Sequence, residues 1–168
     1  MDRLVRIIDS INLWVGKTFA WLFIPLTYAL VYEVVATKVF RAPTAWAFDA
    51  GYMLYGMIFM MGAAYTLAIN GHVRGDIFYR LWPARVQATI DLVLYILVFF
   101  PAFIALLIAG WSYAYYSFSI NEKSLQSPFG PIIWPLKMTI PATALLMLLQ
   151  GVSQVIKCVR CLQRGSWQ

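Results

Sequence analysis

Four long apolar stretches dominate the hydrophobic pattern of the chain, and short polar segments separate them. A helix needs about 20 apolar residues to cross the hydrocarbon core of a bilayer, which is about 30 Å thick. Each stretch meets that length. The sequence therefore predicts four membrane-spanning helices, at about residues 18–39, 46–69, 88–117 and 132–156.

Residues 1–17 carry a different pattern, in which apolar side chains return at helical spacing. Such a pattern predicts an amphipathic helix that lies along a membrane surface or packs against a partner helix. We expect the surface position, with the polar face toward water. The apolar face holds Leu4, Ile7, Ile8, Ile11, Trp14 and Val15, and the polar face holds Asp2, Arg3, Arg6, Asp9 and Asn12.

The composition supports this reading, because 62% of the residues are hydrophobic and only 12% are charged. Soluble domains carry about 25% charged residues. We therefore expect an all-α integral membrane protein in which residues 1–168 form a single domain. The net charge of +6 would suggest nucleic acid in a soluble protein, but here the basic residues flank the apolar stretches. Anionic headgroups explain that placement better, so we expect membrane lipids and no nucleic acid as partners.

The distribution of lysine and arginine predicts the orientation, because cytoplasmic flanks of membrane helices are enriched in these residues. Nine basic residues fall on one side of the four predicted spans and four fall on the other. This asymmetry places both termini in the cytoplasm. The richer side holds Arg3, Arg6, Lys17, Arg74, Arg80, Arg85, Lys157, Arg160 and Arg164, and the other holds Lys38, Arg41, Lys123 and Lys137.

Two features of the spans predict how the helices are shaped and packed. Residues 88–117 would form a helix of about 45 Å, longer than the bilayer core, so we expect it to tilt, bend or project. Pro101 lies in the middle of that stretch and predicts a kink there. The second span is rich in small residues that let helix backbones approach closely, and we assign Gly56, Gly62 and Ala63 to helix packing.

Glu33 is the acidic residue that lies most clearly inside an apolar stretch. It admits two interpretations: the ion-exchanging group of a small proton-coupled carrier, or an interfacial carboxylate paired with Lys38 or Arg41. The second is favoured, because Glu33 lies only five residues before Lys38, near the end of its span. Asp49 belongs to the same outer set of charges and lies in the first turn of the second span, where it complements the helix dipole.

The single histidine lies in the most polar stretch of the chain, residues 70–83, which read NGHVRGDIFYRLWP. His72 has no companion that would complete a metal site or a catalytic arrangement. The stretch connects the second and third spans on the cytoplasmic side, so we expect a polar turn that contacts a partner or lipid. Its proposed contact residues are Gly71, His72, Arg74, Asp76 and Arg80.

Candidate cofactor chemistry is sparse. Cys158 and Cys161 form one Cys-x-x-Cys pair, which is half of a typical zinc site, and two reduced thiols are the expected state. The predicted spans contain no histidine, which argues against haem ligation. We therefore expect no enzyme and no cofactor in this chain. A membrane anchor for a redox enzyme stays open as an alternative, and it predicts bound haem or quinone.

The stretch FDAGYMLYGMIFMMGAAYTLAINGHVRGDIFY resembles the small membrane subunit, the Q-type subunit, of tripartite ATP-independent periplasmic (TRAP) transporters. Its GAAY followed by GHVR-x-D looks like the most recognisable signature of that family. The likeness extends to RAPTAWAFD and to SLQSPFGPIIWPLKMTIPATALLMLLQG, and so covers most of the chain. Gly75 departs from the bulkier residue that the family often has between Arg74 and Asp76.

The resemblance implies a specific function. Such transporters take organic acids, usually carboxylates, into bacteria across the inner membrane, using a sodium gradient and a periplasmic binding protein. A large membrane subunit holds the sodium and substrate sites and moves as an elevator, and the small subunit serves it as a static scaffold. The outer loops, residues 38–48 and 120–134, are candidates for weak, transient docking of the binding protein. The sequence does not identify the transported acid.

Overall fold

The structure, a computed structural model, describes residues 2–69, 71 and 82–165, and it confirms the all-α fold class. Four continuous rods are long and apolar enough to cross a membrane, at Arg3–Lys38, Ala47–Ala68, Ala84–Ser119 and Trp134–Arg164. The helices that build them are α1 (Asp2–Ala20), α2 (Phe23–Lys38), α3 (Ala47–Ala68), α5 (Ala84–Leu94), the π-helical segment η1 (Tyr95–Phe99), α6 (Phe100–Ser119) and α7 (Trp134–Arg164).

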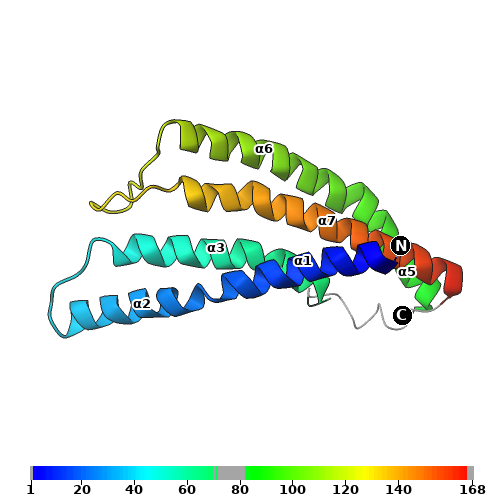
Figure 1. The fold of residues 1–168 in the computed structure, drawn as a ribbon, viewed down its shortest axis with the longest axis horizontal. Coiled ribbons are helices and arrows are strands. Elements are labelled where there is room, and N and C mark those ends of the chain that lie inside the picture. Colours follow the sequence, from blue (N-terminus) through cyan, green and yellow to red (C-terminus); the bar gives the residue numbers. More distant parts are fainter. Residues whose placement is uncertain (1, 70, 72–81, 166–168) are drawn as a thin grey trace.

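The rods run along one another, so that α1 begins and α7 ends at the same end of the molecule (Figure 1). The α2–α3 and α6–α7 connections lie together at the opposite end. Helix α7 is the centre of the bundle, since it packs against α6, α3, α5 and α1. This arrangement fits a four-span chain with both ends on one side, and below we call the end with the two connections the outer end.

The amphipathic N-terminal segment is part of the bundle. Helix α1 packs against α3 and α7, and only a short irregularity at Trp21 and Leu22 separates it from α2. The predicted surface helix and the first predicted span are therefore one rod of 36 residues. The physical reason is that α1 carries polar side chains that match polar side chains of α7, as described below.

The predicted bend of the third span is present, and its form is a π-helical turn. The Phe100 amide donates to the Tyr95 carbonyl five residues earlier, and this turn lies directly before Pro101. Proline has no amide hydrogen, and its ring crowds the carbonyl four residues before it, so one wider turn relieves the conflict. In Figure 1 the rod formed by α5 and α6 curves over α7.

Small residues bring the helices together, but at positions that differ in part from the predicted ones. A Cβ placed on Gly56 would lie 2.9 Å from Leu136 Cδ1, so Gly56 does serve close packing of α3 against α7. Ala63 packs against the buried cluster of Ala64, Leu67 and Met147. A Cβ on Gly62 would meet nothing within 4 Å, so its assignment to helix packing was wrong. At three glycines not predicted for this role, a Cβ would lie closer than 3 Å to a neighbouring side chain: Gly16, Gly110 and Gly151.

Candidate functional site

A stripe of polar side chains runs along one face of α7, in the second half of the helix. Gln150, Ser153, Gln154 and Lys157 follow the i, i+3, i+4, i+7 spacing that places residues on one helix face. Gln150, Ser153 and Gln154 are buried, and Lys157 is half-buried. Buried polar groups require hydrogen-bond partners. The stripe therefore requires matching polar groups on the helices that cover it.

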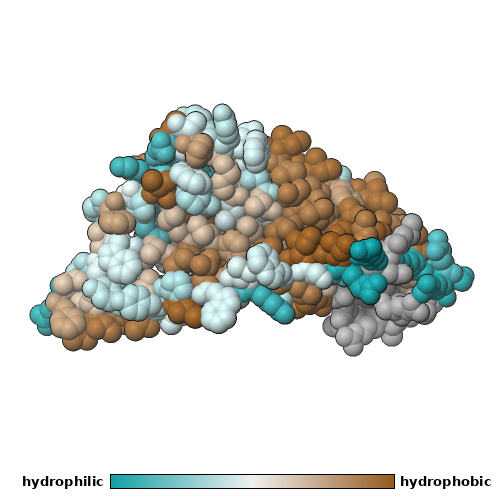
Figure 2. Space-filling view, in the orientation of Figure 1, coloured by the Kyte–Doolittle hydropathy of each residue, from teal (hydrophilic) through white to brown (hydrophobic). Residues whose placement is uncertain are grey.

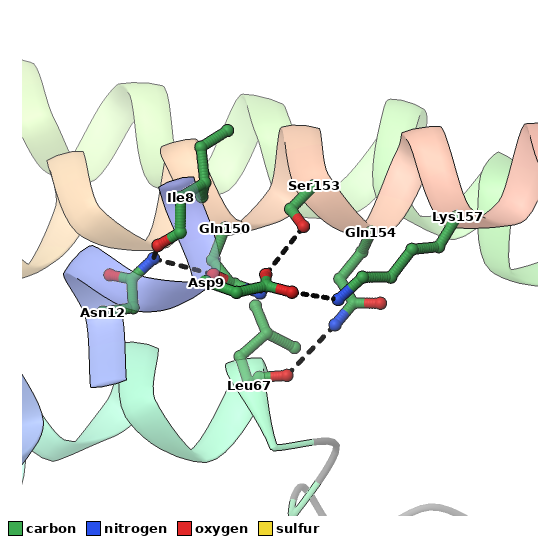
Figure 3. A network of polar contacts seen from close by, with 8 residues as sticks. All are labelled: Ile8, Asp9, Asn12, Leu67, Gln150, Ser153, Gln154 and Lys157. Carbon is green, nitrogen blue, oxygen red and sulfur yellow. Dashed lines mark hydrogen bonds and ion pairs between the residues drawn. The ribbon is translucent and has the colours of Figure 1, made fainter. Parts of the chain in front are cut away.

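Asp9 of α1 supplies the central acceptor of this network (Figure 3). Its Oδ1 accepts hydrogen bonds from Gln150 Nε2 and Ser153 Oγ, each at 2.8 Å. Its Oδ2 lies 2.8 Å from Lys157 Nζ. One carboxylate thus binds three donors from two turns of α7, and it fixes where α1 crosses that helix.

Asn12 extends the network by one turn of α1. Its Nδ2 donates to Gln150 Oε1 at 2.7 Å and to the Ile8 carbonyl at 3.2 Å, and the residue is only 1% exposed. The expectation that Asp9 and Asn12 lie on a solvated face was therefore wrong. Asp9 and Asn12 point into the bundle because α7 offers partners there, whereas Arg3 and Arg6 of the same predicted face are exposed. The apolar side chains Leu4, Ile7, Ile11 and Trp14 are exposed on the outside, where lipid or another protein can cover them.

The network also reaches α3. Gln154 Nε2 donates to the Leu67 carbonyl at 3.1 Å, in the last turn of α3, where helix carbonyls lack intrahelical partners. Three rods are thus held at one level by polar contacts of one helix face. The donors and the carboxylate are engaged with one another, so this arrangement is suited to fixing helices in place.

A second set of polar contacts holds the two connections against the helices at the outer end, and the first of these contacts are made by Glu33. The Glu33 carboxylate accepts from the Thr44 amide at 3.1 Å, from Thr37 Oγ1 at 3.0 Å and from the Thr44 hydroxyl. The predicted pairing with Lys38 or Arg41 was wrong, and both of these side chains are exposed. The connection after α2 turns back, with Arg41 at a φ of 53°, and so brings Thr44 rather than a cation to the carboxylate.

Asp49 is the second member of this outer set. It lies in the first turn of α3, as predicted, but it is completely buried and not an interfacial partner for a cation. Its carboxylate accepts from Ser124 Oγ at 2.7 Å and from the Ser127 hydroxyl, both in the α6–α7 connection. Asp49 therefore fastens the loop of the second half of the chain onto a helix of the first half.

Lys137 and Glu122 form an ion pair beside these loops. Lys137 Nζ also lies 4.0 Å from the centre of the Tyr113 ring, a cation–π geometry. The hydrogen bond from Lys137 holds the pKa of Glu122 below its usual range. This pair fixes the start of α7 to the end of α6 and to the connection between them.

The predicted cytoplasmic corner is described only in part. The Gly71 amide donates to the Thr66 carbonyl at 2.8 Å and so closes the end of α3, and Gly71 is exposed. His72, Arg74, Asp76 and Arg80 lie outside the described residues. Their predicted contacts with a partner or lipid therefore stay predictions.

Cys158 and Cys161 are buried thiols that pack against Ala88 where α5 meets α7. Cys161 Sγ lies 3.6 Å from the Ala84 carbonyl. Within residues 2–69, 71 and 82–165, no three His, Cys, Asp or Glu side chains are grouped in a way that could hold a metal ion.

The polar stripe of α7 was not predicted from the sequence, although a signal for it exists. Four polar residues at helical spacing inside an apolar stretch are costly unless they face other protein groups. Asp9 and Asn12 are polar residues of the same kind, and they would have been the natural partners for the stripe, which would have predicted that α1 packs against α7. The serine pair that binds Asp49 left no comparable signal, because serines are common in loops.

Comparisons with known proteins agree with this architecture. The family model described as "Tripartite ATP-independent periplasmic transporters, DctQ component" matches residues 26–161. The chain is also similar to the sialic acid TRAP transporter permease protein SiaT of Haemophilus influenzae (strain 86-028NP), with 24% identity over 100 residues. That match covers 60% of this chain and 16% of the relative, so the chain spans only a small part of the length of the curated protein.

Proposed function

Because this chain belongs to the DctQ-component family of TRAP transporters, we propose that it is a static scaffold for the large, moving membrane subunit of its transporter. Members of this family are small permease subunits of TRAP transporters, so the chain is a transporter component and not an enzyme. Membership also implies association with a large membrane subunit. The proposal adds how it acts: it widens the fixed part of the complex in the inner membrane of a bacterium, with both termini in the cytoplasm.

The observation that carries the scaffold role is the network of Asp9 with Gln150, Ser153 and Lys157. A subunit that carried ions or substrate would present polar groups to a pathway. Here the Asp9 carboxylate is used to hold α1 on α7, and Glu33 and Asp49 are used to hold the outer connections. The contacts of Glu33 with two threonines also give no support to the proton-carrier alternative.

Helix α6 offers the surface that we assign to the large subunit. The most apolar stretch of the rod Ala84–Ser119 contains no buried residue, unlike the corresponding stretches of the other three rods. Figure 2 shows a broad hydrophobic surface over this part of the bundle. Ala102, Ala105 and Ala109 form an exposed stripe of small side chains on α6. Membrane helices associate through such stripes because they allow close backbone approach.

The outer loops, residues 38–48 and 120–134, are the surface that we assign to transient docking of the periplasmic binding protein. Both loops lie at the same end of the bundle (Figure 1) and are fastened by Glu33 and Asp49. Leu125, at 99% exposure, projects from the second loop. A surface that is already ordered binds at a smaller entropic cost, which suits short encounters.

The proposed cargo is an organic acid of the carboxylate class, moved with sodium. The curated relative is named for sialic acid, which is a carboxylate, and this supports the class without identifying the acid. Sodium is expected in the large subunit, with no cofactor in this chain. At the cytoplasmic corner, Gly71, His72, Arg74, Asp76 and Arg80 are proposed to contact the large subunit or lipid.

The test is uptake into proteoliposomes that contain this chain, the large subunit, or both, with the binding protein and labelled acid outside. The proposal expects uptake only with both membrane subunits and an inward sodium gradient. It also expects the large subunit alone to bind sodium. Uptake by this chain alone, or sodium binding that requires this chain, would contradict the division of roles.

A further inference from the structure

A hollow of about 250 Å³ lies between the first rod and α3, on the surface of the bundle. Its origin is a pair of glycines. At Gly16 the backbone of α1 lies directly against Tyr65, since a Cβ there would be only 2.4 Å from Tyr65 Cβ. One turn away on α3, Gly62 leaves open space within 4 Å. The lining residues are Gly16, Lys17, Ala20, Phe23, Ile58, Gly62, Tyr65 and Thr66.

The hollow, which we call the α1–α3 groove, is polar at one end and apolar at the other. The two rods are antiparallel (Figure 1) and Gly16 meets Tyr65, so Lys17 and Thr66 lie toward one end of the groove and Phe23 and Ile58 toward the other. The Lys17 end is on the side where α1 begins and α3 ends. The Phe23 end points toward the outer end, into the part of the bundle that the hydrocarbon core would surround.

We propose that the α1–α3 groove binds an anionic phospholipid, with one acyl chain along Gly62 and its phosphate at Lys17. A lysine keeps its charge at the headgroup level while its stem lies along apolar surface. Trp14 and Trp21, both exposed, flank Lys17 on the same rod, and such rings favour the membrane interface. The groove polarity matches a lipid of the leaflet nearest the termini, and the positive side chain matches an anionic headgroup.

The bound lipid would complete the surface that the glycines leave open. Gly16 draws α1 onto α3, and Gly62 prevents α3 from filling the space beside that contact. A lipid chain held there would cover apolar atoms of Phe23 and Ile58 without any change in the helices. This site goes beyond the scaffold role, because a scaffold could pack its helices without it.

The experiment is native mass spectrometry of the purified complex with its large subunit, after incubation with phosphatidylglycerol or phosphatidylcholine. The wild type is expected to retain phosphatidylglycerol preferentially. Gly62→Leu fills the groove and is expected to lose one bound lipid, and Lys17→Gln is expected to weaken retention about fivefold. Lys38→Gln and Val34→Phe change exposed residues of the same rod outside the groove and are expected to match the wild type.

Two results would overturn the proposal. One is retention of phosphatidylglycerol by Lys17→Gln and Gly62→Leu at the wild-type level. The other is capture of the large subunit, rather than lipid, by a photo-crosslinking residue placed at Ala20 on the groove wall, which keeps the proposal testable if Gly62→Leu does not fold. Assembly of the two subunits is read in the same spectra, so failure of the lipid site is distinguishable from failure of the scaffold role.

Discussion

Lys157 Nζ lies 2.8 Å from Asp9 Oδ2, although 148 positions separate the two residues in the chain. The pair joins the first helix to the last, and each side chain is 24% exposed. Charge-assisted hydrogen bonds of this kind are stronger than neutral ones. Asp9 also accepts from Gln150 and Ser153, so loss of its carboxylate would leave three donors without this acceptor.

We expect Asp9→Ala to destabilise the purified complex by about 1–3 kcal/mol, because it leaves partly buried donors unsatisfied. The measurement is the unfolding midpoint in detergent. Arg6→Gln is the matched control, since Arg6 is an exposed charged residue of the same helix and its loss is expected to have little effect. Equal midpoints for the two variants would contradict the structural importance of the network.

The four spans could be predicted from the sequence because the thickness of a bilayer sets a strict length for an apolar helix. The role of α1 could not. The polar face of an amphipathic helix usually meets water, and only the presence of Gln150, Ser153 and Lys157 on α7 turns Asp9 and Asn12 inward. A long-range match of this kind is invisible to a local hydrophobic pattern.

The outer contacts and the glycines show the same limit. Glu33 was expected to find a nearby cation, but a reversal of the chain brought Thr44 to it from eleven residues away. Gly56 and Gly62 look alike in the sequence, yet one touches Leu136 and the other borders a groove. A glycine predicts that close approach is possible, and only the position of the neighbouring helix decides whether it occurs.

Ala105→Phe is expected to weaken assembly with the large subunit, because a ring on the α6 stripe separates surfaces that must meet closely. Overpacking of this kind costs about 1–3 kcal/mol, which corresponds to a loss of affinity between about fivefold and about 150-fold. The measurement is the fraction of large subunit recovered with tagged chain as detergent dilution increases. Val34→Phe, on the exposed face of α2, is the control. If Val34→Phe disrupted assembly and Ala105→Phe did not, the partner surface would have to be reassigned to α2.

Glu33→Gln is expected to leave sodium-driven uptake by the complete transporter unchanged in rate and in pH dependence. The reason is that Glu33 binds Thr37 and Thr44 and, in the proposed function, carries no ion. Uptake is measured in proteoliposomes between pH 6 and pH 8. If Glu33→Gln assembled as much complex as the wild type but lost uptake, the result would favour the proton-carrier alternative.

The lowered pKa of Glu122 predicts how the stability of the outer end depends on pH. Its pKa in the folded protein is lowered from the ordinary value of 4.5 by the hydrogen bond from Lys137. A carboxyl group with a lowered folded pKa contributes stability above its unfolded pKa, and the contribution is lost as pH falls through the folded pKa. We therefore expect the wild type to have a higher melting temperature than Glu122→Gln at pH 7. The difference between the two melting temperatures should narrow as the pH falls below 4.5. A difference that grows on acidification would contradict the pairing with Lys137.

The most direct test of the central claim is co-purification from native membranes with a tag on this chain, followed by mass spectrometry of what is retained. The scaffold account predicts one large multi-span membrane protein in stoichiometric amount, retained through mild detergent. Recovery of the chain alone, or of a self-dimer that moves solute in vesicles, would contradict it.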